Sequence, residues 1–461
     1  MCLSRPGSGR ELLSAIRSCL LTNAGLMIDS FLDSQMFAKA FTPNFYLEPV
    51  DNELQLRIGT PSPAAPKDKR ILVIGGGVSG MTSAWALMDQ GYDVTILSDR
   101  WADRKNRITS QIAGALWEYP PAVCGKHTDA ISLCHSKGWA MTSYKIFEQI
   151  VTKLGETDGI DHGVRMRIAN FFFDTPLEAR PDQLEKWEEI CSLSHTIKGL
   201  KRSADLIQHH SVDQKAGMKD AYQLLSPAVD TDVYMMWLHF VLSCKGATFV
   251  TERIKGSLLD QEEELLSRFD AYAIINATGL SALELAGDET VYPLRGAIIR
   301  VKNDGTKFPK LTEALAVTHD ETYGTDEDMV FIVPRNDNIL ILGGITEPNE
   351  WNLNLTVDTP VIKRMRERCN AFVPGLENAE YDDETDLLQG LRPFRGSNVR
   401  VERETAPRKD GSHSRIVHTY GQGGSGFSLS FGCAGTVVSL VQEIEASKPP
   451  AKMELVNAVC Y

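Results

Sequence analysis

Short apolar runs that stop at a glycine are the clearest pattern along this chain. The run "ILVI" (Ile71–Ile74) is wholly apolar and ends at Gly75, which is typical of a strand buried on both faces of a parallel sheet. Ser79–Gln90 then predicts a helix that Gly91 ends, and Val94–Leu97 predicts a second buried strand. These segments together predict one strand–helix–strand unit.

Strand patterns return in the second half of the chain. "FDAYAIINATGL" (Phe269–Leu280) predicts another strand that ends at glycine. "VYPLRGAIIRVK", "EALAVTH" and "MVFIVPRNDNILILGG" follow it, and the last predicts a hairpin with its turn at Asn336–Asn338. Helical patterns occupy residues 129–151 and 435–447. Nucleotide-binding strands on both sides of β-rich segments predict a discontinuous fold of two domains.

The expected fold class is α/β with α+β character, in which a Rossmann-type dinucleotide-binding domain is interleaved with a β-rich substrate domain. Residues 1–69 are expected to be an N-terminal extension and linker, with an amphipathic helix at 11–32 and a Pro-rich linker at 59–70. The expected segments are 70–150, 245–285 and 415–447 for the dinucleotide-binding domain, 151–244 and 286–414 for the substrate domain, and 448–461 for a C-terminal tail.

Composition narrows the classes of partner. The chain has 461 residues, of which 43% are hydrophobic and 24% charged, as in an ordinary soluble globular protein. Its net charge of -13 repels phosphate backbones, so nucleic acid is not an expected partner. Because no apolar run approaches the roughly 20 residues of a membrane helix, no membrane partner is expected either. A homodimer is compatible with these features.

The cysteines indicate a reducing compartment. There are nine, scattered along the chain without a CxxC motif, so we expect reduced thiols and no zinc site. The chain has no HExxH motif, and no metal is expected. The C-terminus "NAVCY" is not the S-K-L peroxisomal signal, and the expected location is the cytoplasm.

The motif G-x-G-x-x-G stands between the first predicted strand and its helix. Gly75 permits a tight turn, Gly77 lets the main chain approach a pyrophosphate, and Gly80 lets the helix pack closely on the strand. Asp99, after the second strand, stands where an acid would bind a ribose hydroxyl, while its neighbour Arg100 would suit a 2′-phosphate. The alternative is a glycine-rich turn without a ligand.

Three further segments suit contacts with a bound dinucleotide. "INATGL" (Ile275–Leu280) ends a strand at glycine, and "RITSQIAGALWEYPP" (Arg107–Pro121) is a loop rich in small and hydroxylated residues. "HTYGQGGSGFSLSFGCAG" (His418–Gly435) concentrates glycines near the end of the chain. The alternatives are a plain strand-to-turn junction for the first and a surface loop for the second.

Taken in order, these motifs resemble the D-amino-acid oxidase family of FAD enzymes, which includes D-aspartate oxidase. "VIGGGVSG", "SDR", "AGALW", "INATG", "RGAIIRV", "IVPR", "GLRPFR" and the C-terminal glycine run follow the family's order over about residues 70–447. The resemblance implies FAD as cofactor. The positions it assigns to the cofactor are Gly75, Gly77, Val78, Ser79, Gly80, Asp99, Arg100, Thr109, Ser110, Gln111, Ala113, Gly114, Ala115, Ile254, Gly279, Gly423, Gly424, Ser425, Gly426, Phe427 and Ser428.

The resemblance also implies a substrate site, with two departures. Arg392 matches the arginine that binds the substrate carboxylate, and the carbonyl of Gly424 would accept a hydrogen bond from the substrate amine. Phe331 and Glu327 stand where the family usually has tyrosines, and Tyr323 lies nearby in the acidic stretch "THDETYGTDEDM". An acidic lid over the site would favour a basic or bulky amine, although a solvated loop is the plainer interpretation.

The implied reaction is oxidation of a D-amino acid by hydride transfer to flavin N5, followed by hydrolysis of the imine to a 2-oxo acid and ammonia, with O2 reduced to hydrogen peroxide. No side chain needs to act as a base if the amine is neutral. Two alternatives remain: a flavin amine oxidase or dehydrogenase that acts on a non-standard amine or amino acid, and a flavin-binding protein without turnover.

Overall fold

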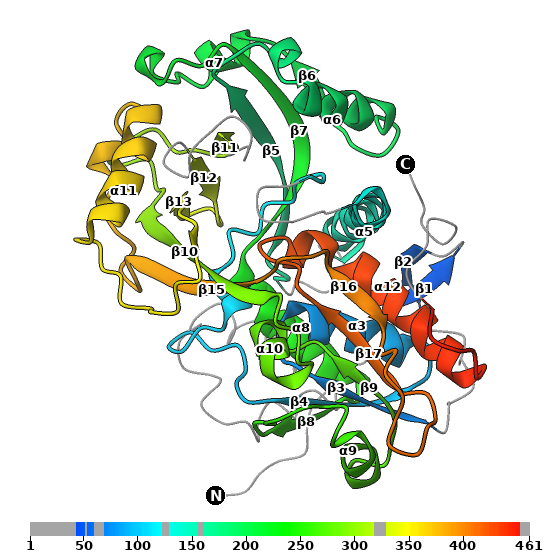
Figure 1. Ribbon diagram of the computed structural model, residues 1–461. Coiled ribbons are helices and arrows are strands. Elements are labelled where there is room, and N and C mark those ends of the chain that lie inside the picture. The colour runs from blue at the N-terminus through cyan, green and yellow to red at the C-terminus, as the bar shows by residue number, and fades with distance from the viewer. Residues whose placement is uncertain are drawn as a thin grey trace, which may run out of the picture.

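The described residues form two large sheets, a two-stranded sheet and a cluster of helices (Figure 1). The computed structural model describes residues 43–50, 53–59, 69–121, 129–154, 161–317 and 329–451. The predicted helix at 11–32, nearly all of the linker at 59–70, the stretch with Tyr323 and Glu327, and most of the C-terminal tail lie outside these residues. The α/β class, with a Rossmann-type layer beside a β-rich one, is confirmed.

The first sheet contains the strand–helix–strand unit predicted from the sequence. Its neighbouring strands are parallel, except that β16 runs antiparallel to β17. β3, β4 and β9 correspond to the three predicted buried strands. In spatial order the six strands are β16 (Arg400–Arg403), β17 (Ile416–Tyr420), β9 (Ala271–Asn276), β3 (Arg70–Ile74), β4 (Asp93–Ser98) and β8 (Thr248–Thr251).

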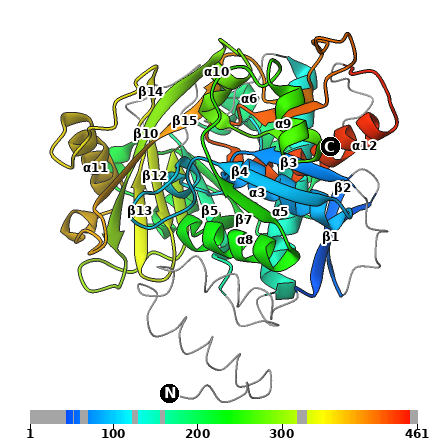
Figure 2. The same cartoon turned by 90° about the horizontal axis from the view of Figure 1, so that it is seen from below.

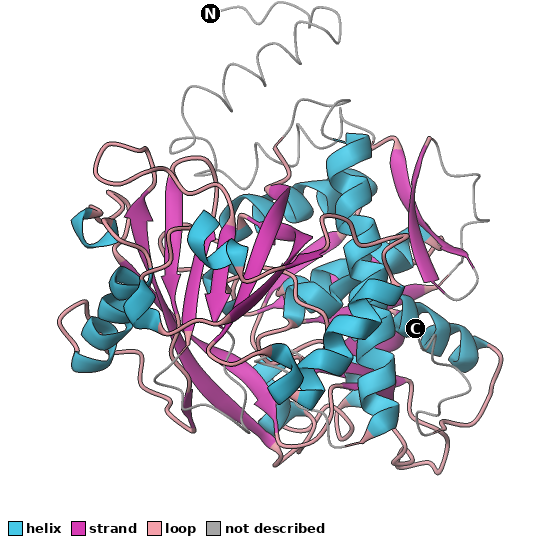
Figure 3. Ribbon diagram, turned by 90° about the horizontal axis from the view of Figure 1, so that it is seen from above, coloured by secondary structure: helices cyan, strands magenta, loops and turns pink. Residues whose placement is uncertain are grey.

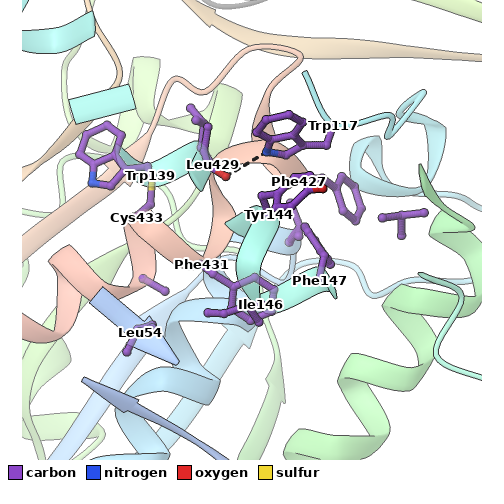
Figure 4. Packing of buried hydrophobic residues seen from close by; sticks show 14 of the residues in the cluster. Leu54, Trp117, Trp139, Tyr144, Ile146, Phe147, Phe427, Leu429, Phe431 and Cys433 are labelled. Carbon is purple, nitrogen blue, oxygen red and sulfur yellow. Dashed lines mark hydrogen bonds between the residues drawn. The ribbon is translucent and has the colours of Figure 1, made fainter. Parts of the chain in front are cut away.

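Long helices pack together beside this sheet (Figure 3). α12 (Gly426–Glu445) packs against both α3 (Val78–Asp89) and α5 (Ala130–Gln149). The approach of α12 to α5 is close, because a Cβ on Gly432 would lie 2.1 Å from the Cα of Trp139. Aromatic rings fill the space on either side of this contact (Figure 4).

The second sheet is largely antiparallel, and α11 (Pro360–Phe372) covers one of its faces (Figure 2). The predicted hairpin is confirmed: β12 pairs antiparallel with β13, and the Asn336 side chain accepts hydrogen bonds from two main-chain N–H groups of the turn. In spatial order the strands are β14 (Glu347–Pro348), β10 (Val291–Lys302), β13 (Ile339–Gly343), β12 (Val330–Pro334), β11 (Ala314–Val317), β5 (Val164–Phe173), β7 (Asp220–Val229) and β6 (Lys201–Arg202), with β15 (Leu387–Arg395) also paired to β10.

The remaining helices are shorter or connect the two layers. They are α4 (Thr109–Ile112), α6 (Pro181–Ser192), α7 (Asp205–His209), α8 (Thr231–Lys245), α9 (Glu262–Arg268) and α10 (Ala282–Leu285), with a π-helical turn at Ile150–Leu154.

Two elements join the dinucleotide-binding layer although the predicted segments placed them in the substrate domain. α8 was assigned to the substrate domain, but it packs against α3 because Tyr234 and Trp237 join the aromatic core of the dinucleotide-binding layer. β16 was assigned to the substrate domain as well, but its four residues pair with β17 at the edge of the six-stranded sheet.

The N-terminal extension contributes a hairpin that was not predicted. β1 (Phe45–Val50) pairs antiparallel with β2 (Glu53–Ile58), and alternate residues on each strand are buried in the main core. The ion pair between Lys245 and Asp89, 2.6 Å long, lies beneath it: Lys245 also donates to the Phe45 carbonyl, and the N–H of Leu47 donates to Asp89. The folded structure therefore includes residues well before Arg70.

Two further expectations need correction. Among the described residues, α12 is long and apolar enough by composition to cross a membrane, although no such run was expected from the sequence. Since 67% of its apolar window is buried inside the protein, a core helix explains its composition. Reduced thiols were expected throughout, yet Cys134 is disulfide-bonded, whereas Cys191, Cys244, Cys369 and Cys433 are free.

Candidate active site

A cavity of about 670 Å³ extends from the carboxyl ends of β3, β4 and β9 to the face of the nine-stranded sheet. The cavity is lined by all three predicted substrate-binding residues, Arg392, Gly424 and Phe331. Nearly all of the predicted cofactor positions line it too. They are Gly75, Gly77, Val78, Ser79, Asp99, Arg100, Thr109, Ser110, Ala113, Gly114, Ala115, Ile254, Gly279, Gly423, Gly424, Ser425, Gly426, Phe427 and Ser428.

Gly75 forms the tight turn at the end of β3. Its φ is +125°, in the region that favours glycine, and a Cβ there would lie 2.2 Å from the carbonyl oxygen of Ala277. The N–H of Ala277 in turn donates to the carbonyl of Ile74 at 2.9 Å. The "INATGL" segment is thus brought against the G-x-G-x-x-G turn, and both line the cavity.

Gly80 and Gln111 do not line the cavity. Gly80 lies on the inner side of α3, where a Cβ would be 2.0 Å from the Gly75 carbonyl oxygen, so it permits close packing of helix and strand. Gln111 is buried and donates to Asp232 at 2.9 Å, while its own oxygen accepts from the N–H of Asp103. The Gln111 side chain therefore does not face the cavity, because its amide holds the loop that follows β4.

Two serine hydroxyls stabilise the G-x-G-x-x-G turn by accepting hydrogen bonds from its main chain. The Ser98 hydroxyl accepts a hydrogen bond from the N–H of Gly76 at 3.1 Å, and that of Ser110 accepts from Val78 at 3.0 Å. Ser98 was missed in the sequence because a serine at the end of a strand carries no specific signal. Other lining residues that were not predicted include Glu118, Arg253, Thr278, Gln389, Pro393 and Gln422.

The C-terminal glycine run ends in a helix that starts earlier than expected. α12 begins at Gly426, whereas the pattern predicted a start near residue 435. Gly421 and Gly423 have φ values of +83° and +57°, so the run turns sharply before the helix begins. The N–H of Gly423 donates to the carbonyl of Pro393 at 3.1 Å, which joins this turn to the strand that carries Arg392.

This geometry fits FAD. The main chain at Gly75 and Gly77 lines the cavity, and α3 and α12 both begin at the cavity wall. Helix N-termini carry partial positive charge and free N–H groups, which favour the pyrophosphate of a dinucleotide. The residues that would hold FAD are therefore main-chain groups at the ends of β3 and β9 and at the start of α12.

Arg392 lies on β15, opposite Leu294 of β10. Its Nη1 donates to the carbonyl of Ile345 at 3.1 Å, and no carboxylate pairs with it among the described residues. Its guanidinium lies directly over Gly296, where a Cβ would be 2.4 Å from Nη1 and 2.5 Å from Nη2. A half-buried guanidinium that keeps unpaired N–H groups at a cavity is suited to bind a carboxylate.

A row of cross-strand neighbours forms the apolar face of the cavity. Ala316 of β11 lies opposite Phe171 of β5 and Phe331 of β12, and Phe331 lies opposite Gly343 of β13. The ring of Phe331 packs on Gly114, where a Cβ would lie 2.7 Å from its Cε1. The loop after β4 thus contacts the substrate-domain sheet at this point.

A buried network of ion pairs holds the loop after β4 in place. Arg107 makes three hydrogen bonds to Asp232, at 3.0 and 3.1 Å from Nε and 3.0 Å from Nη2, and Arg300 of β10 approaches the same carboxylate at 3.4 Å. Burial alone would lower the pKa of Arg107, but Asp232 and Glu384 outweigh it and raise that pKa. Arg335 donates to the carbonyl of Ala113 at 2.6 Å, and burial lowers its pKa to about 10.

Comparison with known proteins identifies the family. A family model described as FAD dependent oxidoreductase matches residues 70–440. The chain belongs to the FAD-dependent oxidoreductase family. The chain is therefore an oxidoreductase whose cofactor is FAD, as the resemblance implied.

Two proteins similar in sequence to this FAD-dependent oxidoreductase are named as D-amino-acid oxidases. A D-amino-acid oxidase of Streptomyces coelicolor is 30% identical over 368 residues, which cover 80% of this chain and 95% of that protein. A D-amino acid oxidase of Dugesia ryukyuensis is 27% identical over 379 residues, 81% of this chain and 98% of that protein.

Solved structures share the fold at lower identity. Glycine oxidase from Geobacillus kaustophilus aligns with a TM-score of 0.62 at 18% identity, covering 85% of this chain and 99% of that one. L-amino acid deaminase from Proteus vulgaris aligns with a TM-score of 0.58 at 14% identity, covering 88% and 96%. At this identity the likeness concerns the fold alone.

Proposed function

We propose that this FAD-dependent oxidoreductase is an oxidase that converts a D-amino acid to a 2-oxo acid, ammonia and hydrogen peroxide. The observation that carries the proposal is Arg392: its guanidinium reaches the cavity without a carboxylate partner among the described residues. The names of the relatives in Streptomyces coelicolor and Dugesia ryukyuensis support the D-amino-acid class.

The chain's own groups bind and orient the substrate. Arg392 holds the carboxylate with paired N–H donors, and the carbonyl of Gly424, also at the cavity wall, accepts a hydrogen bond from the amine. FAD, when bound, supplies the two-electron oxidation of the carbon–nitrogen bond, and O2 takes up the electrons and two protons as hydrogen peroxide. Water then hydrolyses the imine to ammonia and the 2-oxo acid. With the carboxylate and amine both fixed, the α-carbon has one allowed orientation.

The visible spectrum of the purified protein tests this proposal. We expect a flavin spectrum that bleaches when a D-amino acid is added without oxygen, and peroxide when oxygen is admitted. Arg392→Met should lower kcat/KM by about a hundredfold or more, because it removes a charge-assisted pair in a partly buried site. Arg392→Lys keeps the charge but not the planar pair of N–H donors, so its kcat/KM should lie between those of the wild type and Arg392→Met. A flavin that no D-amino acid reduces would contradict the proposal.

One observation favours a second candidate. Phe331 offers no hydroxyl to a carboxylate, and its ring is packed on Gly114. An oxidase or dehydrogenase for a non-standard amine or amino acid would need fewer groups for the carboxylate. Flavin that is reduced by amines but by no D-amino acid, with Arg392→Met unchanged in rate, would support this candidate.

A further inference from the structure

Glu118 lies in the cavity wall, on the loop between α4 and α5. The main chain there is fixed to β7: the N–H of Trp117 donates to the Pro227 carbonyl at 2.9 Å, and the Ser226 hydroxyl donates to the Trp117 carbonyl at 2.7 Å. The indole of Trp117 donates to Ala140 of α5. Three hydrogen bonds of the preceding residue, to β7 and α5, therefore fix the main chain beside Glu118.

One oxygen of the Glu118 carboxylate is already bound. Lys186 of α6, only 3% exposed, donates from Nζ to Oε1 at 2.7 Å and also to the Pro121 carbonyl at 2.8 Å. The other oxygen, Oε2, has no hydrogen-bond partner among the described residues, and it is not fully buried. Because Glu118 lines the cavity, this free oxygen is an acceptor available to a bound molecule.

Glu118 lies far from Arg392 across the substrate-domain sheet. Arg392 is on β15, and the strand order from there is β10, β13, β12, β11 and β5. Phe171 of β5 lines the cavity and packs on Tyr222, with ring centroids 5.1 Å apart. Glu118 lies close enough to Tyr222 for its charge to raise the pKa of that phenol, after the larger effect of burial.

Apolar groups line the wall between these two charged side chains. Phe331, Ala316 and Phe171 succeed one another across β12, β11 and β5 and all line the cavity. A ligand whose carboxylate is bound by Arg392 would extend its side chain along this row. A methylene chain suits the row, and a hydrogen-bond donor suits its end at Glu118.

We propose that Glu118 determines substrate specificity, by selecting amino acids whose side chain has an apolar stem and ends in a nitrogen donor, an ammonium or an amide. This inference rests on the proposed function, since it takes the carboxylate to be bound at Arg392. Lys186 positions Glu118 by holding Oε1, so that Oε2 faces the cavity.

Pairs of substrates of equal length test the inference. In D-2,4-diaminobutyrate, D-ornithine and D-lysine an ammonium replaces the terminal methyl of D-norvaline, D-norleucine and D-2-aminoheptanoate. We expect kcat/KM to favour the nitrogen member at least about tenfold for the length that reaches Glu118, as a charge-assisted hydrogen bond in a partly buried site should. D-glutamine, compared with D-norleucine, separates amide from ammonium recognition.

Glu118→Gln sharpens the test because it reverses the polarity of the group at the cavity. Lys186 can still donate to the amide oxygen, which turns the NH2 group toward the substrate. The nitrogen members should lose at least about tenfold in kcat/KM, while the methyl members change less than about threefold. Glu189→Gln is the matched control, since Glu189 accepts from Lys137 at 2.6 Å in a similar ion pair but does not line the cavity.

The outcomes separate this inference from the proposed function. If the methyl members reduce the flavin as well as or better than the nitrogen members at every length, Glu118 does not select the side chain, although the proposed function stands. The same conclusion follows if Glu118→Gln acts equally on both series. If no member of either series reduces the flavin, the proposed function fails and this inference with it. The wild-type preference needs no variant, so the test holds even if Glu118→Gln does not fold.

Discussion

The two ends of the cavity are built from different parts of the chain. At the dinucleotide end, the wall is main chain: Gly75 touches Ala277, and Gly423 is bonded to Pro393. At the substrate end, the wall consists of side chains that extend from separate strands, such as Phe331 and Arg392. A main-chain wall depends on where glycines stand, whereas a side-chain wall depends on which strands become neighbours.

The two ends of the cavity should therefore respond differently to substitutions. A Cβ in the main-chain wall collides with another backbone, which cannot move away without moving a strand. A change in the side-chain wall is met by rotation of a flexible side chain, so it alters binding more than folding. Substitutions at the dinucleotide end should therefore lower stability and FAD binding, whereas substitutions at the substrate end should change substrate kinetics.

The largest effect should come from removing the N-terminal hairpin. Truncation of residues 1–59 exposes the core that Phe45, Leu47, Leu54 and Leu56 cover, all of them at most 2% exposed. Losing four such side chains costs roughly 6–12 kcal/mol, comparable with the whole stability of a typical domain. We expect a protein that does not retain FAD and has no cooperative thermal transition.

A truncation of residues 1–42 is its control, because it leaves in place the contacts that the hairpin makes with the other described residues. We expect it to keep FAD and a melting temperature close to that of the full chain. Equal behaviour of the two truncations would show that the dinucleotide end needs only the residues from Arg70 onward.

Gly75→Ala should have the next largest effect. The new Cβ would meet the Ala277 carbonyl at 2.2 Å, so β3 and β9 must separate where they hold the cofactor. We expect a loss of more than about 3 kcal/mol in the free energy of unfolding and little bound flavin, measured by denaturation and by absorbance.

Gly59→Ala is a closely matched control. Gly59 has a φ of +124° against +125° at Gly75, but nothing lies within 4 Å of its Cβ position. In Gly59→Ala the free energy of unfolding should fall by only roughly 1–2 kcal/mol, because of backbone strain, and the variant should keep its flavin. Similar losses in both variants would assign the effect at Gly75 to backbone conformation rather than to close approach.

Glu404→Gln tests a chain of side-chain hydrogen bonds that leads to the main-chain wall. Glu404 lies 3.0 Å from Nε2 of His418, and His418 contacts Asn276, which accepts from Thr278 in the cavity wall. The hydrogen bond with His418 is the main cause that lowers the pKa of Glu404 to about 2. Since the folded pKa lies below the unfolded value, the unfolded state binds the proton more readily, and this stabilisation is lost as the pH falls from about 4.5 to about 2.

The difference in stability between wild type and Glu404→Gln should thus be on the order of 3 kcal/mol above pH 5 and shrink toward pH 2. Denaturation at a series of pH values measures it. Glu402→Gln, two residues earlier near the end of β16 and with a side chain 31% exposed, should show a smaller difference. A difference for Glu404→Gln that does not change with pH would contradict this account.

The dinucleotide end was largely predictable from the sequence because its determinants are local. Short apolar runs predicted β3, β4 and β9, the first and last of them ending at glycine, and the turn residues predicted the β12–β13 hairpin. The hairpin at residues 45–58 was not predicted, although its sequence alternates the buried Phe45 and Leu47 with the partly buried Tyr46 and Glu48.

The substrate end was less predictable because its contacts are not local. Gln111 looked like a cofactor ligand, but its partner Asp232 is 121 residues away in the chain. Glu118 lies in the predicted loop Arg107–Pro121 but was not singled out there, and only the fold shows that Lys186 holds it at a cavity. The strand pairings that set such neighbours are fixed by the whole sheet rather than by any short motif.

The smallest effect on stability should come from Gly296→Ala, which tests the claim that the substrate end responds through binding. The new Cβ would lie 2.4–2.5 Å from three atoms of the Arg392 guanidinium, the mobile end of a long side chain. The side chain can swing aside, so we expect the free energy of unfolding to change by less than about 1 kcal/mol and FAD to be retained.

The displaced guanidinium should bind the carboxylate less well. We expect KM to rise about tenfold, equivalent to about 1.4 kcal/mol, with a smaller change in kcat. Gly396→Ala, just beyond β15, is the control, because its Cβ would come no closer than 3.5 Å to another group. If Gly296→Ala instead lost FAD or melted at a much lower temperature than the control, the substrate end would be as rigid as the dinucleotide end, and the contrast between a main-chain wall and a side-chain wall would fail at the residue where it is sharpest.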